Sequence, residues 1–313
     1  MADRLRLFVA VVLRDELAAR VDGVRLGLGS SEVGRLPPHI TLVAPFNAPR
    51  DDLAGLLQRL RHLAEASTPS SCLLGPIRQF ARALPVAYLA VDDPTHALVG
   101  LAEAARATVR GANAQPDGSV FVPHVTVANR VAPDVADAAT VALGHFRAPL
   151  EIDGFSLLAR DPDAAEHRWR EIADFVLGRP LVRGRGGIEL VLSRTRMLDP
   201  VVAERAGGGS LAIVGAPWAI TARLGDELAG AAGGDLVGPY ARVTSLWVEP
   251  SLRGIGVASR LLETAERAAS ERGASRIEAM AHDDAVRRYL HGRGYATQPS
   301  DRTWLSKALG EPA

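Results

Sequence analysis

Pro38-His39-Ile40-Thr41-Leu42-Val43 is the stretch that decides which fold we expect, because a second copy reads Pro123-His124-Val125-Thr126-Val127-Ala128. In each copy a proline precedes a histidine, and one apolar residue separates the histidine from a threonine. Side chains two positions apart on a strand point to the same face of a sheet. Each copy is therefore expected to present an imidazole and a hydroxyl together. Two such strands facing one another would supply both pairs to a single cleft.

The segments around the two copies have the apolar patterns of strands and helices. The expected strands are residues 5–13, 86–91, 152–158 and 169–177, and the expected helices are residues 15–24, 51–66 and 97–109. The order strand, helix, histidine strand, helix occurs twice in a loose form, which predicts two similar lobes.

A different pattern begins after residues 179–187, which are rich in glycine, arginine and proline and are interpreted as an interdomain linker. The strands expected beyond them are residues 188–192, 218–223, 228–232, 243–248 and 276–281, followed by a helix at 284–292 and a strand from 295 toward 305. Arg253-Gly254-Ile255-Gly256-Val257-Ala258 lies between a strand and a helix. Its glycines permit close approach of a ligand, and the amides at a helix start bind anions such as a pyrophosphate.

Composition narrows the class of protein. The 313 residues are 47% hydrophobic, and the formal net charge is zero. The length suits two domains, and the zero charge argues against binding of nucleic acid by bulk attraction to phosphate alone. The single cysteine, Cys72, excludes an intramolecular disulfide. The apolar run at residues 7–13 is too short to span a bilayer, and no signal-peptide cleavage pattern follows it. We therefore expect a soluble cytoplasmic protein without a membrane partner.

The paired motifs, the opening strand, the segment 80–91 and the closing stretch 169–177 together resemble the two-histidine (2H) phosphoesterase superfamily. That superfamily includes bacterial 2'-5' RNA ligase-like proteins and cyclic nucleotide phosphodiesterases. The resemblance covers residues 1–178 and implies a bilobal, pseudo-symmetric fold. It also implies metal-free cleavage of a phosphodiester in a nucleotide or RNA, typically a 2',3'-cyclic phosphate, without a cofactor.

The residue types suit this chemistry. An unperturbed imidazole has a pKa of about 6.5, so one histidine can be neutral and another protonated near neutral pH. His39 and His124 are the expected acid and base, and the sequence leaves open which histidine has which role. Thr41 and Thr126 are expected to bind the non-bridging oxygens of the phosphate.

Two further residues are candidates for substrate binding. Tyr88 is placed to stack on a base, although a tyrosine on a strand also suits a core. Arg130 is placed to contact phosphate, although many relatives have an arginine one residue nearer the histidine.

Residues 218–305 resemble the GCN5-related N-acetyltransferase (GNAT) family, whose Arg/Gln-x-x-Gly-x-Gly/Ala signature is matched by Arg253, Gly256 and Ala258. The resemblance implies a mixed central sheet, acetyl-CoA as the cofactor, and an amine acceptor that the sequence does not identify. Main-chain groups of Leu246 and Val248 are implied to bind the pantetheine arm. The residues implied to bind the pyrophosphate are Arg253, Gly254, Ile255, Gly256, Val257 and Ala258.

The resemblance is incomplete at the residues that would transfer the acetyl group. The tyrosine that often protonates the departing thiolate falls on Leu290, with Tyr289 beside it on a different helical face. Glu249 and His282 lie near positions where a base could act. Tyr289, Glu249 and His282 are therefore the candidates for acetyl transfer.

The sequence thus predicts a two-domain α+β / α/β protein: a 2H phosphoesterase domain at 1–178, a linker at 179–187 and a GNAT domain at 188–313. The preferred function is a bifunctional enzyme, a cyclic phosphodiesterase fused to an acetyl-CoA-dependent N-acetyltransferase. Two alternatives stay open. In one, acetyl transfer is the main activity and the first domain only recognises a nucleotide-like or RNA acceptor. In the other, the chain is a non-catalytic sensor of RNA ends and acetyl-CoA.

Overall fold

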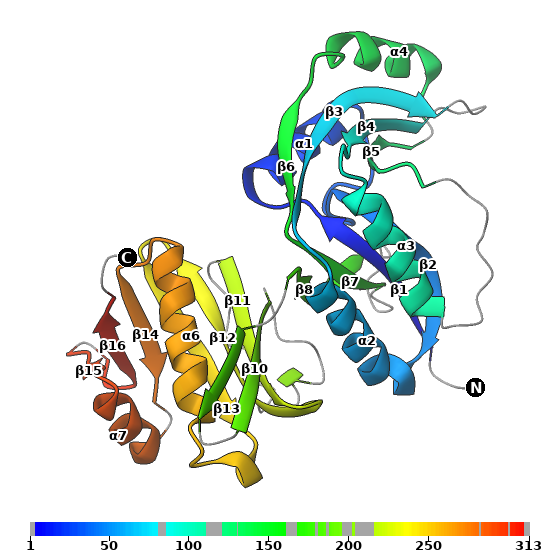
Figure 1. Cartoon of the computed structure of the whole chain (residues 1–313). Coiled ribbons are helices and arrows are strands. Elements are labelled where there is room, and N and C mark those ends of the chain that lie inside the picture. Colours follow the sequence, from blue (N-terminus) through cyan, green and yellow to red (C-terminus); the bar gives the residue numbers. More distant parts are fainter. Residues whose placement is uncertain are drawn as a thin grey trace. The chain divides into compact units, whose positions relative to one another are not determined.

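Two eight-stranded sheets organise the computed structural model of the chain, one in each of the units Met1–Arg179 and Pro180–Ala313 (Figure 1). The structure describes residues 4–80, 86–110, 121–129, 131–160, 168–178, 181–185, 188–195, 202–203, 216–281, 283–299 and 301–309. The predicted two-domain α+β organisation is confirmed.

The sheet of the first unit is antiparallel and has the strand order β6-β3-β4-β5-β2-β1-β7-β8. Its strands are β1 (Arg4–Val12), β2 (His39–Pro49), β3 (Ser70–Phe80), β4 (Val86–Asp92), β5 (His124–Ala128), β6 (Ala148–Ile152), β7 (Gly154–Arg160) and β8 (Trp169–Val176). The order divides into two halves of four strands, β6-β3-β4-β5 and β2-β1-β7-β8, and the inner strand of each half carries a histidine motif. The predicted bilobal, pseudo-symmetric fold is therefore confirmed.

The helices of the first unit are α1 (Asp15–Gly27), α2 (Leu53–Ala66), α3 (Ala97–Arg110) and α4 (Pro133–Ala142), with a 3-10 turn η1 (Arg50–Asp52). The helix α2 buries an apolar face that includes Leu56 and Leu60, and it packs beside α3 (Figure 1). The sequence patterns do not predict α4, because its buried residues, Ala136 and Ala139, are too small to give a clear apolar period. The strand expected at 152–158 is confirmed as β7, but it begins at Gly154, since Asp153 separates β7 from β6.

The sheet of the second unit has the order β15-β16-β14-β13-β12-β11-β10-β9. Its strands are β9 (Leu181–Arg185), β10 (Ile188–Thr195), β11 (Ala216–Leu224), β12 (Glu227–Val237), β13 (Tyr240–Val248), β14 (Arg276–Met280), β15 (Ala296–Thr297) and β16 (Trp304–Ala308). The pair β13–β14 is parallel and the other described pairs are antiparallel, which confirms the predicted mixed sheet.

The long helix α6 (Val257–Glu271) lies against the strands β11, β12 and β13 of this sheet (Figure 1). Its buried face includes Val257, Leu261 and Leu262. A 3-10 turn η2 (Pro250–Leu252) joins β13 to α6, and α7 (Asp284–Gly292) follows β14. None of the helices in the described ranges has both the length and the apolar composition needed to cross a membrane.

The interpretation of residues 179–187 as a linker is wrong for most of that segment. Residues 181–185 form β9, which pairs with β10 from Leu181 opposite Leu192 to Arg185 opposite Ile188. Main-chain hydrogen bonds hold a strand at the edge of a sheet, and such a strand tolerates glycine and charged residues. The strand β9 could therefore not be predicted from the composition of this segment. The final strand expected from 295 toward 305 is likewise two strands, β15 and β16.

Candidate functional site

The two histidine strands are neighbours where the halves of the first sheet meet. β2 and β5 run antiparallel, and Ile40 lies directly opposite Val125. Both of these side chains are fully buried, so the residues before and after them point to the opposite face. The residues that share this second face, all partly exposed, are His39, Thr41, His124 and Thr126.

The antiparallel register also fixes how these four residues are arranged. On one side of the pair Ile40–Val125, Thr126 stands across from His39; on the other side, His124 stands across from Thr41. The two histidines are therefore diagonal neighbours, with Cβ atoms roughly 7–8 Å apart for this arrangement. That spacing leaves room for a phosphate group between the two rings.

Both imidazoles are oriented by the same main-chain contact. Nδ1 of His39 lies 2.9 Å from the carbonyl oxygen of Pro37, and Nδ1 of His124 lies 2.7 Å from that of Val122. A carbonyl oxygen only accepts hydrogen bonds, so each Nδ1 carries a proton and donates it. The neutral ring is then a base at Nε2, and the protonated ring is an acid at the same atom. A proline stands between each acceptor and its histidine, and its fixed φ restricts the turn.

The surroundings of His39 disfavour the charged form of its ring. Burial lowers the pKa of His39 to about 4; the hydrogen bond to Pro37 opposes this shift, and positive charge at Arg25 and His124 adds to it. His39 is therefore neutral near pH 7, with an unprotonated Nε2.

Aromatic rings from neighbouring strands support each imidazole. The ring of Phe8 on β1 lies 5.2 Å from that of His39. Phe80 and Tyr88 stack with 4.0 Å between their centroids, and both meet His124 edge-on, at 5.1 and 5.4 Å. Tyr88, the candidate for base stacking, is only 7% exposed, so its ring supports His124 more than it offers a free face. Phe8 and Phe80 carry no local motif, and the sequence patterns do not single them out.

Two candidates lie outside the described residues, Arg130 in the first unit and His282 in the second. In the ranges that the structure describes, no group of three or more His, Cys, Asp or Glu side chains is arranged to hold a metal ion.

A pocket of about 540 Å³ opens in the second unit where β13 and β14 separate. The two strands pair from Tyr240 opposite Arg276 to Val243 opposite Ala279. Beyond Val243, the remainder of β13 lines the pocket, together with the start of α6 and residues of β14 and α7. A strand edge that leaves its partner offers main-chain donors and acceptors to an extended ligand that carries amide groups.

The glycine motif forms one wall of this pocket. Gly254 has a φ of 83° and Gly256 a φ of 95°, a region that L side chains rarely adopt. Gly256 is the N-cap of α6 and has no side chain to cap the helix, so amides of the first turn remain for a ligand. The positive end of the helix dipole also lies there, which suits a pyrophosphate.

Most of the predicted cofactor-binding residues line the pocket. They are Leu246, Val248, Arg253, Gly254, Gly256, Val257 and Ala258. Ile255 does not line it, and its side chain is 42% exposed. Glu249 does not line it either; it precedes η2, and its amide donates to the carbonyl oxygen of Ala229.

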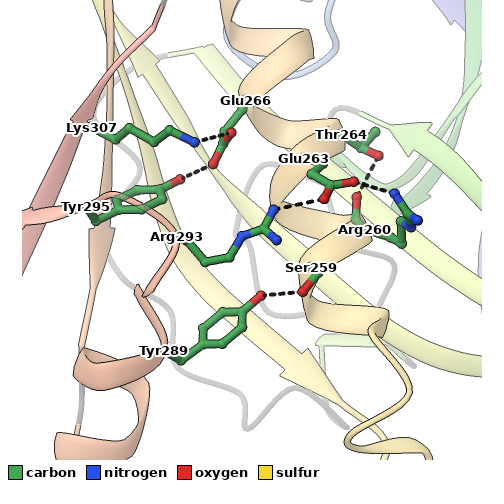
Figure 2. A network of polar contacts seen from close by, with 9 residues as sticks. All are labelled: Ser259, Arg260, Glu263, Thr264, Glu266, Tyr289, Arg293, Tyr295 and Lys307. Carbon is green, nitrogen blue, oxygen red and sulfur yellow. Dashed lines mark hydrogen bonds and ion pairs between the residues drawn. The ribbon is translucent and has the colours of Figure 1, made fainter. Parts of the chain in front are cut away.

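Tyr289 and Leu290 both line the same pocket. The hydroxyl of Tyr289 lies 3.3 Å from Oγ of Ser259 at the start of α6 (Figure 2). Burial raises the pKa of Tyr289, and the hydrogen bond to Ser259 opposes that shift. Leu290 is 1% exposed and belongs to the core. The hydroxyl available to this pocket from α7 is therefore that of Tyr289.

A polar network fastens α6 to α7 and β16 beside Tyr289 (Figure 2). Glu263 accepts hydrogen bonds from Arg260 at 2.7 Å and from Arg293 at 3.0 Å. Burial alone would raise the pKa of Glu263, but the hydrogen bonds from these two arginines lower it. One turn further along α6, Glu266 accepts hydrogen bonds at 3.0 and 2.7 Å from Tyr295 and Lys307. The network fixes the distance between the helices that carry Ser259 and Tyr289.

Comparison with known proteins gives two family matches. The model of the 2'-5' RNA ligase superfamily matches residues 13–164, and that of the acetyltransferase (GNAT) family matches residues 210–295. A protein of Bacillus licheniformis, named as a candidate phosphoesterase, is 31% identical over 145 residues, which cover 46% of this chain and 82% of that protein.

Two solved structures each match part of this chain. E. coli LigT complexed with 3'-AMP is 17% identical, covers 56% of this chain and 99% of its own, and has a TM-score of 0.44. PaiA N-acetyltransferase of Thermoplasma acidophilum, in complex with coenzyme A, is 14% identical, covers 29% of this chain and 60% of its own, and has a TM-score of 0.28.

Proposed function

The chain belongs to the 2'-5' RNA ligase superfamily and carries a GNAT-family domain in its second unit, and we propose that it is a bifunctional enzyme. The first activity is metal-independent hydrolysis of a 2',3'-cyclic phosphate or a related phosphodiester of a nucleotide or RNA. The second is acetyl transfer from acetyl-CoA to an amine.

The observation that carries the first activity is the matched orientation of the two imidazoles. Each Nδ1 is bound to a main-chain carbonyl, so the reactive atom of His39 and that of His124 are both Nε2, on one face of the sheet. His39 is neutral near pH 7 and takes the role of general base. His124 then takes the role of general acid.

The reaction follows from these roles. A water molecule attacks phosphorus, and Nε2 of His39 accepts the proton that the water loses. The bond from phosphorus to one ribose oxygen breaks, and Nε2–H of His124 donates its proton to that oxygen. The hydroxyls of Thr41 and Thr126 donate hydrogen bonds to the non-bridging oxygens, where negative charge increases. The product is a phosphomonoester, and exchange of one proton from His39 and one to His124 with solvent restores the enzyme.

The test of the first activity is hydrolysis of 2',3'-cyclic nucleotides in the presence of EDTA. We expect one phosphomonoester product from the wild type, and a loss of about 10² to 10⁴ in rate in each of His39→Gln and His124→Gln. Full activity in both variants would remove the histidines from the reaction. Activity that EDTA abolishes would show that a metal takes part.

The pocket of the second unit fits acetyl-CoA in two respects. The uncapped start of α6, with Gly254 and Gly256, suits the pyrophosphate. The end of β13 at Leu246 and Val248 pairs with β12 but not with β14, and its open side suits the amides of the pantetheine arm. When bound, acetyl-CoA supplies an activated acetyl thioester. Tyr289 holds a proton on its hydroxyl at the wall of the pocket, where it can donate to a thiolate.

Calorimetric titration with acetyl-CoA tests this second site, and release of thiol on a panel of amines tests the transfer. We expect binding and thiol release with at least one class of amine. Binding with no thiol release on any amine would favour a sensor of acetyl-CoA. No binding would contradict the assignment of the pocket.

A further inference from the structure

A fully buried arginine, Arg25 in the last turn of α1, contacts one histidine strand and the segment that leads into the other. Its Nε and Nη2 donate hydrogen bonds to the carbonyl oxygen of Thr126, at 3.2 and 3.1 Å. Its Nη1 donates to the carbonyl oxygen of Leu36 at 2.8 Å. Thr126 belongs to β5, and Leu36 stands three residues before His39, the first residue of β2. One guanidinium therefore contacts both sides of the junction between the halves of the sheet.

The junction depends on this contact because the strands themselves pair little there. β2 pairs with β5 at one position, Ile40 with Val125, whereas β2 pairs with β1 at eight positions. A single pair leaves the spacing and angle of the two halves weakly determined. The planar fork of an arginine side chain restrains both, since its donors point in fixed directions.

Arg25 is also a buried cation. Burial lowers the pKa of Arg25, and the carboxylates of Asp22 and Glu32 oppose that shift. Nη1 lies 3.3 Å from Oδ1 of Asp22. Because an arginine ordinarily loses its proton only far above neutral pH, the guanidinium keeps its charge near neutral pH.

Within the described residues, the charged and titratable groups that act on His39 come from two elements. They are Arg25 on α1 and His124 on β5, and both disfavour protonation of the ring. The strand β1 contributes the uncharged ring of Phe8, which in turn packs edge-on against Trp169 of β8. Arg25 is therefore a permanent positive charge near a base that must be neutral to act.

We propose that Arg25 is a positioning residue of the phosphodiesterase site: it fixes the spacing of the two histidine strands and keeps a positive charge near His39. The inference rests on the proposed function of the first unit. Two hydrogen bonds from Arg25 end on the main chain of Thr126, one of the four site residues. A shift of the guanidinium therefore moves the site directly.

Two substitutions separate the two parts of the proposal, the geometric part (the spacing of the histidine strands) and the electrostatic part (the positive charge near His39). Arg25→Lys keeps the charge but lacks the fork; we expect kcat to fall about tenfold to 100-fold, with little change in KM and with the acid limb of the pH–rate profile in place. Arg25→Gln removes the charge as well, so we expect a similar fall in kcat and a shift of the acid limb to higher pH. Arg59→Gln is the matched control, since Arg59 is exposed on α2 and pairs with Asp52 at 3.1 Å. Arg59→Gln should change neither kcat nor the position of the acid limb.

The titration of the His39 ring by NMR, in the full-length chain without substrate, gives a readout that does not need activity. If the wild type hydrolyses no phosphodiester, the proposed function fails. Even then, the His39 pKa should be higher in Arg25→Gln than in the wild type and unchanged in Arg25→Lys. An unchanged His39 pKa in a folded Arg25→Gln protein would overturn the electrostatic part. Unchanged kcat in both Arg25 variants would overturn the geometric part. If Arg25→Gln does not fold, Arg25→Lys alone tests both parts of the proposal. An unchanged kcat in Arg25→Lys would overturn the geometric part, and a raised His39 pKa in Arg25→Lys would overturn the electrostatic part.

Discussion

Ile40 and Val125 face one another across β2 and β5, and this single pair sets the candidate site of the first unit. Because both side chains are buried, their neighbours on each strand turn to the other face together. A shift of the register by one residue would bury the histidines and expose the two apolar residues. The site is therefore a consequence of strand register, and it can be tested through the side chains that the register brings together.

The threonines are expected to act on the chemical step. Replacing either Thr41 or Thr126 by valine keeps the shape of the side chain and removes the donor to a non-bridging oxygen. We expect kcat to fall about 10²-fold in each variant, with the thermal unfolding temperature little changed, because both side chains are partly exposed.

Thr108→Val is the matched control, since the hydroxyl of Thr108 donates within α3 to the carbonyl oxygen of Ala104. Kinetics of cyclic nucleotide hydrolysis measure the effect. Equal kcat values for the wild type and both site variants would exclude the proposed role of the threonines.

His39 is expected to make stability depend on pH. Its pKa is about 4 in the folded chain and about 6.5 when unfolded, so the unfolded chain takes up the proton first. The free energy of unfolding should therefore fall as the pH decreases from about 6.5 to about 4, by at most about 3 kcal/mol from this residue. Above about pH 6.5 the His39 ring is neutral in both the folded and the unfolded chain, so its contribution to the free energy of unfolding no longer changes.

Urea unfolding of the wild type and His39→Gln, at about pH 7 and about pH 5, isolates the contribution. The loss of stability on acidification should be smaller in His39→Gln. An equal loss in the two proteins would mean that His39 is solvated like an ordinary surface histidine.

Gly256 is expected to be required for acetyl-CoA binding. An alanine there would have to adopt a φ of 95°, which costs roughly 1–3 kcal/mol and disturbs the start of α6. Gly273→Ala is the matched control, because Gly273 also has a positive φ, 82°, but follows the other end of α6. Both variants should lose stability, and only Gly256→Ala should lose affinity for acetyl-CoA, by tenfold or more in calorimetric titration. Similar affinities in the two variants would place the cofactor elsewhere.

Tyr289 is expected to donate a proton during acetyl transfer. Tyr289→Phe removes the hydroxyl that Ser259 contacts, so thiol release should fall by about 10² to 10⁴ while acetyl-CoA still binds. Tyr240→Phe is a suitable comparison, since Tyr240 is exposed on β13 and does not line the pocket. Unaltered thiol release in Tyr289→Phe would assign the proton transfer to another group.

The sequence predicts the parts of the fold that carry local signals. Strand periodicity places each histidine and its threonine on one face, and the resemblance of the paired motifs His39-x-Thr41 and His124-x-Thr126 to the 2H superfamily implies the first fold; the comparisons confirm the family. The glycine motif implies the second fold through its resemblance to the GNAT signature, and the turn before α6 has positive φ values at Gly254 and Gly256.

The remaining features depend on contacts between distant residues. Arg25 lies one residue beyond the helix expected at 15–24, and only the fold brings it to Thr126, 101 positions later. Phe8 and Phe80 are ordinary apolar residues of strands until the sheet places them beside the histidines. The strand β9 is concealed by glycine and arginine, because an edge strand is held by its main chain.

The pH dependence of kcat/KM for a 2',3'-cyclic nucleotide, measured in EDTA, tests most directly whether His39 and His124 form one catalytic site. We expect the wild-type profile to have an acid limb near pH 4 from His39. His39→Gln should lower the rate and remove the acid limb, and His124→Gln should lower the rate and keep the acid limb. An acid limb that persists in His39→Gln, or a rate that neither substitution lowers, would contradict the account.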